Sequence, residues 1–304
     1  MRDTAVAPRT DDRSSTARRP QPARFDQARQ SPQIDLGSWL RTALVGAGAL
    51  VMLFPFVWMV ATSLTADANL FRTPPQLIPD PVVTDSYRRL LVDMPLGRWM
   101  FNSALVSVVT TTLQVLTSAM AAYAFTRFTF RGRDALFATY LATMMVPIQV
   151  LLVPLFIQMR TLGLVDTYPA LMLPLIASPF GVFLMRQALL TLPRELEEAA
   201  FVDGANHWKV FTRIVLPNSK PAMATVAVFA FMASWNSFLW PLVIVSSESM
   251  MTLPLGLANL QGRFSTAWNL VMAGSTLSLL PIVAVYLVAQ RYIVQGVAQS
   301  GLKG

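Results

Sequence analysis

The residues with the most distinctive chemical spacing lie in residues 191–220, termed here the interhelical segment because an apolar stretch precedes and follows it. Its first part carries three acidic residues, Glu195, Glu197 and Glu198. They follow Pro193, which suits the first turn of a helix, so their negative charge lies at the positive end of the helix dipole. Gly204 then permits a sharp turn, and Asp203 is placed to cap a second helix.

The second part of the interhelical segment has an apolar stripe at helical spacing. The stripe consists of Trp208, Phe211, Ile214 and Val215. Pro217 and Pro221 are expected to end this helix. Two short amphipathic helices of this kind have two interpretations: they lie on a membrane surface, or they form a docking surface for a cytoplasmic partner. The residue types alone leave both open.

Side chains suited to catalysis are scarce. The chain has no cysteine, which excludes thiolate nucleophiles and thiolate metal sites. His207 is its single histidine, so zinc sites with two imidazoles are excluded as well. No Gly-x-x-x-x-Gly-Lys-Ser/Thr phosphate loop occurs. We therefore expect a protein that is not an enzyme and has no metal or cofactor of its own. His207 is interpreted as a plain contact residue or a solvated residue rather than a titratable switch.

The elements around the interhelical segment are apolar. Of 304 residues, 54% are hydrophobic and 13% are charged, and the mean hydropathy is +0.49. A membrane-spanning helix needs about 20 mostly apolar residues. Six stretches free of Asp, Glu, Lys and Arg qualify: Thr42–Leu64, Phe101–Thr126, Leu136–Met159, Tyr168–Met185, Ala222–Val245 and Ala267–Ala289. The sequence predicts an all-α membrane protein with six transmembrane helices, the interhelical segment joining spans 4 and 5.

The basic residues are distributed unevenly between the two sides of these spans. The side that carries both termini and the interhelical segment holds 18 of the 24 Lys and Arg residues. The positive-inside rule places that side in the cytoplasm. The net charge of +8 is therefore a signal of topology, and nothing in the sequence indicates nucleic-acid binding. Residues 1–38 lack apolar periodicity and are predicted to form a disordered cytoplasmic tail.

The interhelical segment resembles the EAA loop of binding-protein-dependent ABC importers. The matching residues are Glu198, Ala199, Ala200, Gly204, Ile214, Leu216 and Pro217, with Asp203, Ala205 and Asn206 around the glycine. Other pieces resemble the carbohydrate branch of that family, like the smaller permease subunit of the maltose importer. They are Phe101-Asn102-Ser103, Trp235-Asn236, Trp240-Pro241, Gln290-Arg291-Tyr292 and Leu302-Lys303-Gly304. The resemblance covers roughly residues 40–304.

The resemblance implies a subunit of a larger importer in a bacterial inner membrane. Its partners would be a second permease subunit, two ATPase subunits, an extracytoplasmic sugar-binding protein and membrane lipid. The ATPase subunits would bind ATP and magnesium. The residues implied to contact the ATPase are those of the EAA loop together with His207 and Trp208.

A path for a neutral sugar needs hydrogen-bonding groups and aromatic faces without charge. The candidates for it are Trp235, Asn236, Ser237, Gln114 and Gln149. Small polar residues in spans also bond neighbouring helices, which is the alternative role for each of them. The spans contain no carboxylate or lysine to relay protons.

The domain boundaries and the function follow from these observations. We expect a disordered tail over residues 1–38, a six-span permease domain over residues 39–290 and a cytoplasmic tail over residues 291–304. The expected function is that of a permease subunit forming half of the path for a disaccharide, oligosaccharide or related polyol. A stand-alone carrier or channel driven by an ion gradient is the alternative.

Overall fold

The computed structural model describes residues 36–74, 77–262 and 266–301. Most of the sequence predicted as the N-terminal tail, residues 1–35, and residues 302–304 of the C-terminal tail lie outside this part of the chain. The chain divides into two units, residues 1–52 and 53–304. Within the described residues the structure is helical, with a single isolated β-bridge between Gln261 and Thr266. The all-α prediction is therefore confirmed for this part of the chain.

Among the described residues, three helices are long and apolar enough to cross a membrane. They are α1 (Leu36–Ser63), α3 (Leu96–Arg127) and α14 (Trp268–Gly301). They coincide with predicted spans 1, 2 and 6. The backbone of α14 continues past Gln290, where the sequence prediction began a C-terminal tail, to Gly301.

The other predicted spans are not single straight helices. Span 3 is divided at Pro147 into α4 (Arg133–Ala142) and α5 (Ile148–Thr161), with a 310 turn at Thr143–Met145 and a bend of 101°. Span 4 consists of α6 (Tyr168–Met172), a 310 turn at Leu173–Leu175, and α7 (Pro179–Leu190), bent by 47°. Proline breaks both because it lacks an amide donor and restricts the residue before it. Counting each bent helix pair as one span gives at most six.

Span 5 is also interrupted. It comprises α11 (Lys220–Trp235) and α12 (Leu239–Ile244), separated by residues 236–238. On its N-terminal side α11 meets the helix of residues 207–218 at a bend of 77°. The prediction of one continuous helix over Ala222–Val245 is thus wrong in detail.

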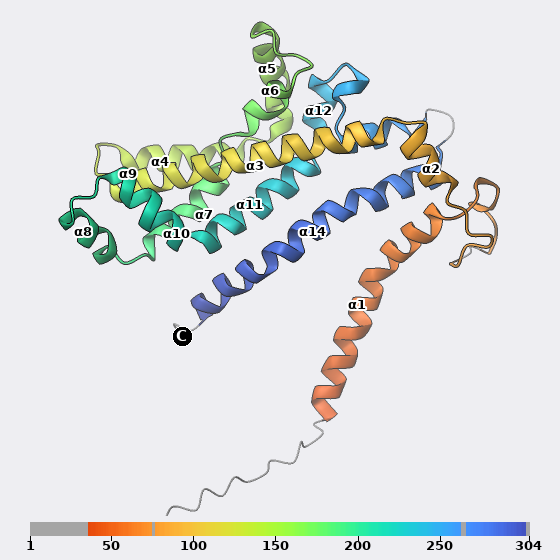
Figure 1. The fold of residues 1–304 in the computed structure, drawn as a ribbon, viewed down its shortest axis with the longest axis horizontal. Coiled ribbons are helices and arrows are strands. Elements are labelled where there is room, and N and C mark those ends of the chain that lie inside the picture. Colours follow the sequence, from red (N-terminus) through yellow and green to blue (C-terminus); the bar gives the residue numbers. More distant parts are fainter. Residues whose placement is uncertain (1–35, 75–76, 263–265, 302–304) are drawn as a thin grey trace, which may run out of the picture. The chain divides into compact units, whose positions relative to one another are not determined.

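Helix α3 is the centre of the second unit (Figure 1). It packs along α7 and α11, and α11 packs in turn on α14. Toward its C-terminal end, Val115, Ala119 and Tyr123 join a core with α7, α11 and the interhelical segment. Toward its N-terminal end, Leu96 and Trp99 join a second core with α2 (Asp85–Val92), α11, α13 (Leu253–Asn259) and α14.

Side-chain hydrogen bonds tie the N-terminal end of α3 to two connections. Asn102 is fully buried and donates to the carbonyl oxygens of Ser249 at 2.9 Å and Met251 at 2.8 Å. Ser249 belongs to a 310 turn at Glu248–Met250, and a similar turn occurs at Asp67–Asn69. The Tyr168 hydroxyl donates to the Asn102 side-chain oxygen at 2.7 Å. Asn102 therefore joins the N-terminal end of α3 to residues 249–251 and to the start of α6.

Candidate functional site

The first helix of the interhelical segment is α8 (Glu195–Val202). It begins two residues after Pro193, and its first turn carries the three glutamates as predicted. Gly204 has a φ of +77°, the left-handed conformation that glycine adopts without strain. The amide of Gly204 donates to Phe201 and the amide of Ala205 donates to Ala200, which closes the helix end with a Schellman motif. The turn predicted at Gly204 is confirmed.

The cap of the second helix is Asn206 and not Asp203. Helix α9 (His207–Val210) begins after Asn206, whose side-chain oxygen accepts a hydrogen bond from the Lys209 amide at 2.9 Å. Asp203 instead ends α8 as its C-terminal cap residue. The Schellman motif takes up Gly204 and Ala205, so the second helix cannot start until Asn206.

Helix α9 continues without a break through a π-helical turn at Phe211–Val215 and α10 (Leu216–Asn218). The helix ends at Asn218, between the two prolines predicted to end it, although Pro217 itself lies inside α10. A proline in a helix removes one amide donor to the preceding turn. The adjacent π-helical turn changes the local bonding pattern, so the helix tolerates Pro217.

The predicted apolar stripe has two parts with different surroundings. Phe211 and Val215 are buried against α3, α7 and α11, and Ile214 is half-buried. Trp208 is 62% exposed, and Val202 at the end of α8 is 88% exposed. One side of the interhelical segment therefore packs against α3, α7 and α11, while large apolar side chains on the other side are exposed to solvent.

A hollow of about 240 Å³ lies at the turn between the two helices. It is lined by Ala200, Asp203, Gly204, Ala205, Lys209, Val210, Arg213 and Ile214. A Cβ atom on Gly204 would meet no atom within 4 Å. The EAA-loop residues thus surround an open depression that has carboxylate and basic groups on its walls.

Glu197 and Glu198 have opposite environments although they are neighbours. Glu198 is exposed, whereas Glu197 is buried and pairs with Arg127, the last residue of α3. Two guanidinium nitrogens of Arg127 lie 2.6 and 2.7 Å from the same carboxylate oxygen. Sequence reasoning missed this pair because 70 residues separate its members. The sequence did contain a hint of the pair: Arg127 directly follows predicted span 2, on the same predicted side of the membrane as the three glutamates.

His207 is exposed and also makes contacts within the chain. Its Nδ1 lies 3.2 Å from the Tyr123 hydroxyl of α3. Its ring meets the rings of Phe128 and Phe201 edge-on, with centroids 4.9 Å apart in both cases. The imidazole therefore links the start of α9 to the end of α3.

The predicted path residues of span 5 separate into different environments. Trp235 is buried, stacks on Phe231 and donates from its indole to the Ser278 carbonyl at 3.2 Å. Asn236 is exposed where α11 ends, and its amide donates to the Met232 carbonyl one turn earlier at 2.8 Å. Ser237 is half-buried in the same interruption. Of these three residues, Asn236 and Ser237 have accessible side chains and Trp235 does not.

The two predicted path glutamines also differ. The Gln114 amide donates to the Leu175 carbonyl, and the Thr117 hydroxyl donates to the Ile176 carbonyl at 3.0 Å. These carbonyls lie in the interruption between α6 and α7. Gln149 is exposed in α5. Gln114 therefore stabilises a broken helix, in keeping with the alternative role considered for small polar groups.

Comparison with known proteins assigns the chain to a family. A family profile described as "Binding-protein-dependent transport system inner membrane component" matches residues 114–299. The chain belongs to this family. It is an inner-membrane permease component of an ABC importer and not an enzyme. This membership sets aside the alternative of a stand-alone carrier or channel.

Several relatives of this permease carry names for transported sugars or related compounds. The arabinooligosaccharides transport system permease protein AraQ of Halalkalibacterium halodurans is 37% identical, over 88% of this chain and 97% of its own length. The lactose transport system permease protein LacG of Rhizobium radiobacter is 35% identical, over 85% and 94%. The sn-glycerol-3-phosphate permease UgpE of Yersinia enterocolitica is 38% identical, over 83% and 93%.

A solved permease shares the fold. It belongs to a bacterial ABC transporter involved in the import of the acidic polysaccharide alginate. The TM-score is 0.74 at 25% sequence identity, and the match covers 86% of this chain and 98% of the other. The chain therefore has an ABC permease fold.

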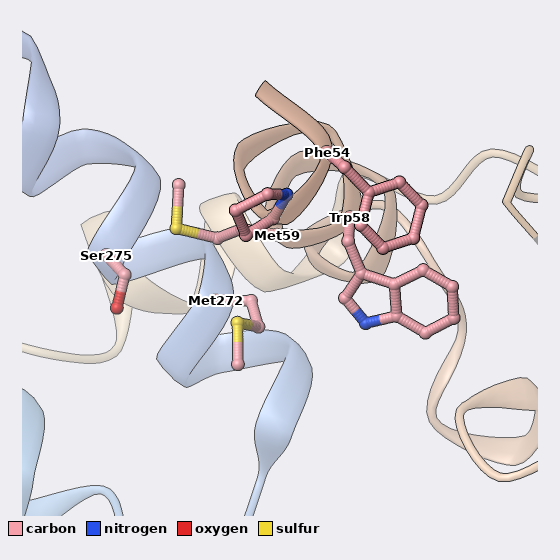
Figure 2. A pocket seen from close by; sticks show the side chains of 6 residues that line it. Phe54, Trp58, Met59, Met272 and Ser275 are labelled. Carbon is pink, nitrogen blue, oxygen red and sulfur yellow. The ribbon is translucent and has the colours of Figure 1, made fainter. Parts of the chain in front are cut away.

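The second unit of the permease also contains an apolar hollow of about 660 Å³ (Figure 2). Phe54, Pro55, Trp58 and Met59 of α1 line it together with Met272 and Ser275 of α14. Ser275 contributes the single hydroxyl in this lining. With so few polar groups the hollow suits apolar neighbours rather than a hydrated solute.

Proposed function

We propose that this permease forms half of the path by which an ABC importer takes up a disaccharide, an oligosaccharide or a related polyol. The observation that carries the proposal is the 37% identity, over 88% of the chain, to a permease named for arabinooligosaccharide transport. The absence of charged residues from the predicted spans supports it, because a neutral sugar needs hydrogen bonds without a fixed charge.

The proposed assembly pairs this chain with a second permease subunit in a bacterial inner membrane. Two ATPase subunits would supply ATP hydrolysis with magnesium, and an extracytoplasmic binding protein would deliver the sugar. The chain would cross the membrane six times, with each interrupted span counted as one. The exposed apolar side chains of α1, such as Leu44 and Val51, are available to lipid or to the second permease.

The interhelical segment is proposed to dock onto an ATPase subunit. Three observations support this role: the exposed Glu198, the exposed apolar Trp208 and Val202, and the open hollow at Gly204. A helix lying on the membrane would bury such apolar side chains in lipid. The acidic start of α8 and the charged walls of the hollow instead suit a partner with both polar and apolar groups.

Uptake tests this function. We expect cells that contain the complete transport system to accumulate at least one member of a labelled panel of arabinooligosaccharides and lactose, with the charged glycerol 3-phosphate as the comparison compound. Accumulation should stop when the partner ATPase gene is deleted, and it should persist when a protonophore collapses the proton gradient while ATP is maintained. Accumulation that survives deletion of the ATPase gene would contradict the proposal.

The orientation of the chain is proposed from the charge distribution, with both termini in the cytoplasm. Single cysteines can report on it because the chain has none of its own. A cysteine at Thr84, which is exposed, should react with a membrane-impermeant maleimide in intact cells. A cysteine at Asn218, also exposed, should react only after the cells are opened. The reverse pattern would invert the topology.

If the sugar passes the interruption of span 5, the variant Asn236→Ala should transport more slowly. The exposed amide would be lost as a hydrogen-bonding group, and one such bond is worth about 1 kcal/mol. We expect uptake per assembled complex to fall roughly five- to tenfold. The measurement is the initial uptake rate divided by the amount of permease and ATPase that copurify.

Thr112→Val provides the matched control for Asn236→Ala. The Thr112 hydroxyl is exposed on α3 and donates to the carbonyl one turn earlier, as the Asn236 amide does. This variant loses the same kind of local bond outside the interruption of span 5. If both variants transport at the same rate per complex, Asn236 is a structural residue and the path lies elsewhere.

A further inference from the structure

The end of α3 is joined to the interhelical segment by an ion pair that lies inside the protein. The side chains of Arg127 and Glu197 are each only 7% exposed. Arg127 also donates from a terminal nitrogen to the Leu189 carbonyl at the end of α7, at 3.0 Å. One guanidinium therefore connects α3, α7 and α8 at a single point.

A buried ion pair is a costly way to join two helices. Removing two charges from water offsets most of their attraction, and a well-packed apolar pair of similar volume is often as stable. An ion pair differs from apolar contact in being directional, because the bonds hold only in a narrow range of geometry. The value of Arg127 and Glu197 thus lies in the fixed position that they impose on α8 relative to α3.

A second polar contact acts on the other helix of the interhelical segment. Tyr123 precedes Arg127 by one turn of α3, and its hydroxyl meets Nδ1 of His207 at the start of α9. The ring of Tyr123 also packs on Phe211, with centroids 5.3 Å apart. The last two turns of α3 therefore hold α8 and α9 together, while Glu198 remains outside on the exposed side.

Helix α3 reaches from these contacts to the interrupted helices. It bonds the interruption of span 4 through Gln114 and Thr117, and it packs along α11, which ends at the exposed Asn236. A displacement of α3 along or about its axis would therefore act directly on both interruptions.

We propose that Arg127 and Glu197 are positioning residues that make α8 and the C-terminal end of α3 move as one body, so that displacement of the interhelical segment reaches the membrane helices. This inference rests on the proposed docking of the segment onto an ATPase. It gives the two adjacent glutamates separate tasks: Glu198 faces the partner and Glu197 holds the segment to α3.

Paired spin labels in the assembled complex test this link. The chain is free of cysteine, so labels can be placed at Leu196 on α8 and Met120 on α3, both exposed and neither assigned to the docking surface. The probe is ATP with vanadate, which traps the ATPase subunits in their closed state. Without further substitution, the distance distribution between the two labels should be the same before and after trapping, because α8 and α3 move together.

Two variants break the pair in different ways. Glu197→Gln keeps the shape of the side chain and removes its charge. The double variant Arg127→Met with Glu197→Leu replaces the pair by apolar groups and avoids an unpaired buried charge, so it assembles even where the single variant does not. In both, copurification of the ATPase should persist, and the distance between the labels should shift or broaden on trapping. Asp134→Asn is the control, since it breaks the exposed pair between Arg133 and Asp134.

The outcomes separate the inference from the proposed function. A merely structural pair would lower the amount of complex but leave the label distances of assembled complexes unchanged on trapping. That result in both pair variants would overturn the inference. Failure of the ATPase to copurify with the unsubstituted chain would overturn the docking proposal and this inference together.

Discussion

Gly204→Asp is expected to abolish uptake while leaving the permease inserted and paired with its partner permease. The glycine has a φ of +77°, and a Cβ atom there meets open space. Within the chain the substitution therefore costs only the strain of a left-handed residue, about 1 kcal/mol. Against a docked partner, the new side chain would fill part of the hollow and carry a negative charge into the interface. A charge that faces a like charge across an interface costs several kcal/mol. Stimulated ATP hydrolysis should therefore fall by about 100-fold or more.

Gly132→Asp is the matched control for this prediction. Gly132 has a φ of +80°, and a Cβ atom there also meets nothing within 4 Å. It lies before α4, outside the interhelical segment. The two substitutions share the backbone strain and the added charge and differ in location. The measurements are copurification of the ATPase and its stimulated rate in a reconstituted complex. Equal behaviour of the two variants would remove the interhelical segment as the docking site.

The parts of the interhelical segment that sequence reasoning predicted are those set by local chemistry. A glycine after an apolar helix predicts a left-handed turn because other residues are strained there, and Gly204 adopts it. The choice of cap failed because Asp203 and Asn206 are both good capping residues. Which one caps depends on where the Schellman motif ends, and that is a property of the folded turn rather than of residue type.

The parts that sequence reasoning could not predict depend on distant contacts. Composition and hydropathy located the apolar stretches but not the interruptions within them. Proline explains a break near Pro147 but not its angle of 101°. Helix α4 packs on α7 and α3 whereas α5 packs on α12, and no local pattern records these neighbours. The orientation of Glu197 toward α3 rather than solvent likewise requires the position of Arg127, 70 residues earlier in the chain.

Gly181→Leu is expected to prevent stable folding of the second unit. A Cβ atom on Gly181 of α7 would lie too close to the Ser118 hydroxyl of α3, 3.2 Å from Ser118 Cβ and 3.3 Å from Val226 Cγ1 of α11. Glycine and other small residues allow membrane helices to approach closely at such crossings. Gly181→Ala is tolerable where the serine hydroxyl can rotate away. A leucine must separate α7 from α3 or α11, at a cost of about 3 kcal/mol or more.

The measurement is the thermal transition of the purified permease in detergent, together with its yield from membranes. Gly181→Leu should lower both sharply and lose uptake as a consequence. Gly97→Leu provides the control, because Gly97 is exposed on α3 and a Cβ atom there meets nothing within 4 Å. Both variants add the same apolar volume to a helix of the same unit. If the two variants melt at the same temperature, α7 does not pack tightly on α3 and α11. Helix α3 would then not be the central packing element of the second unit.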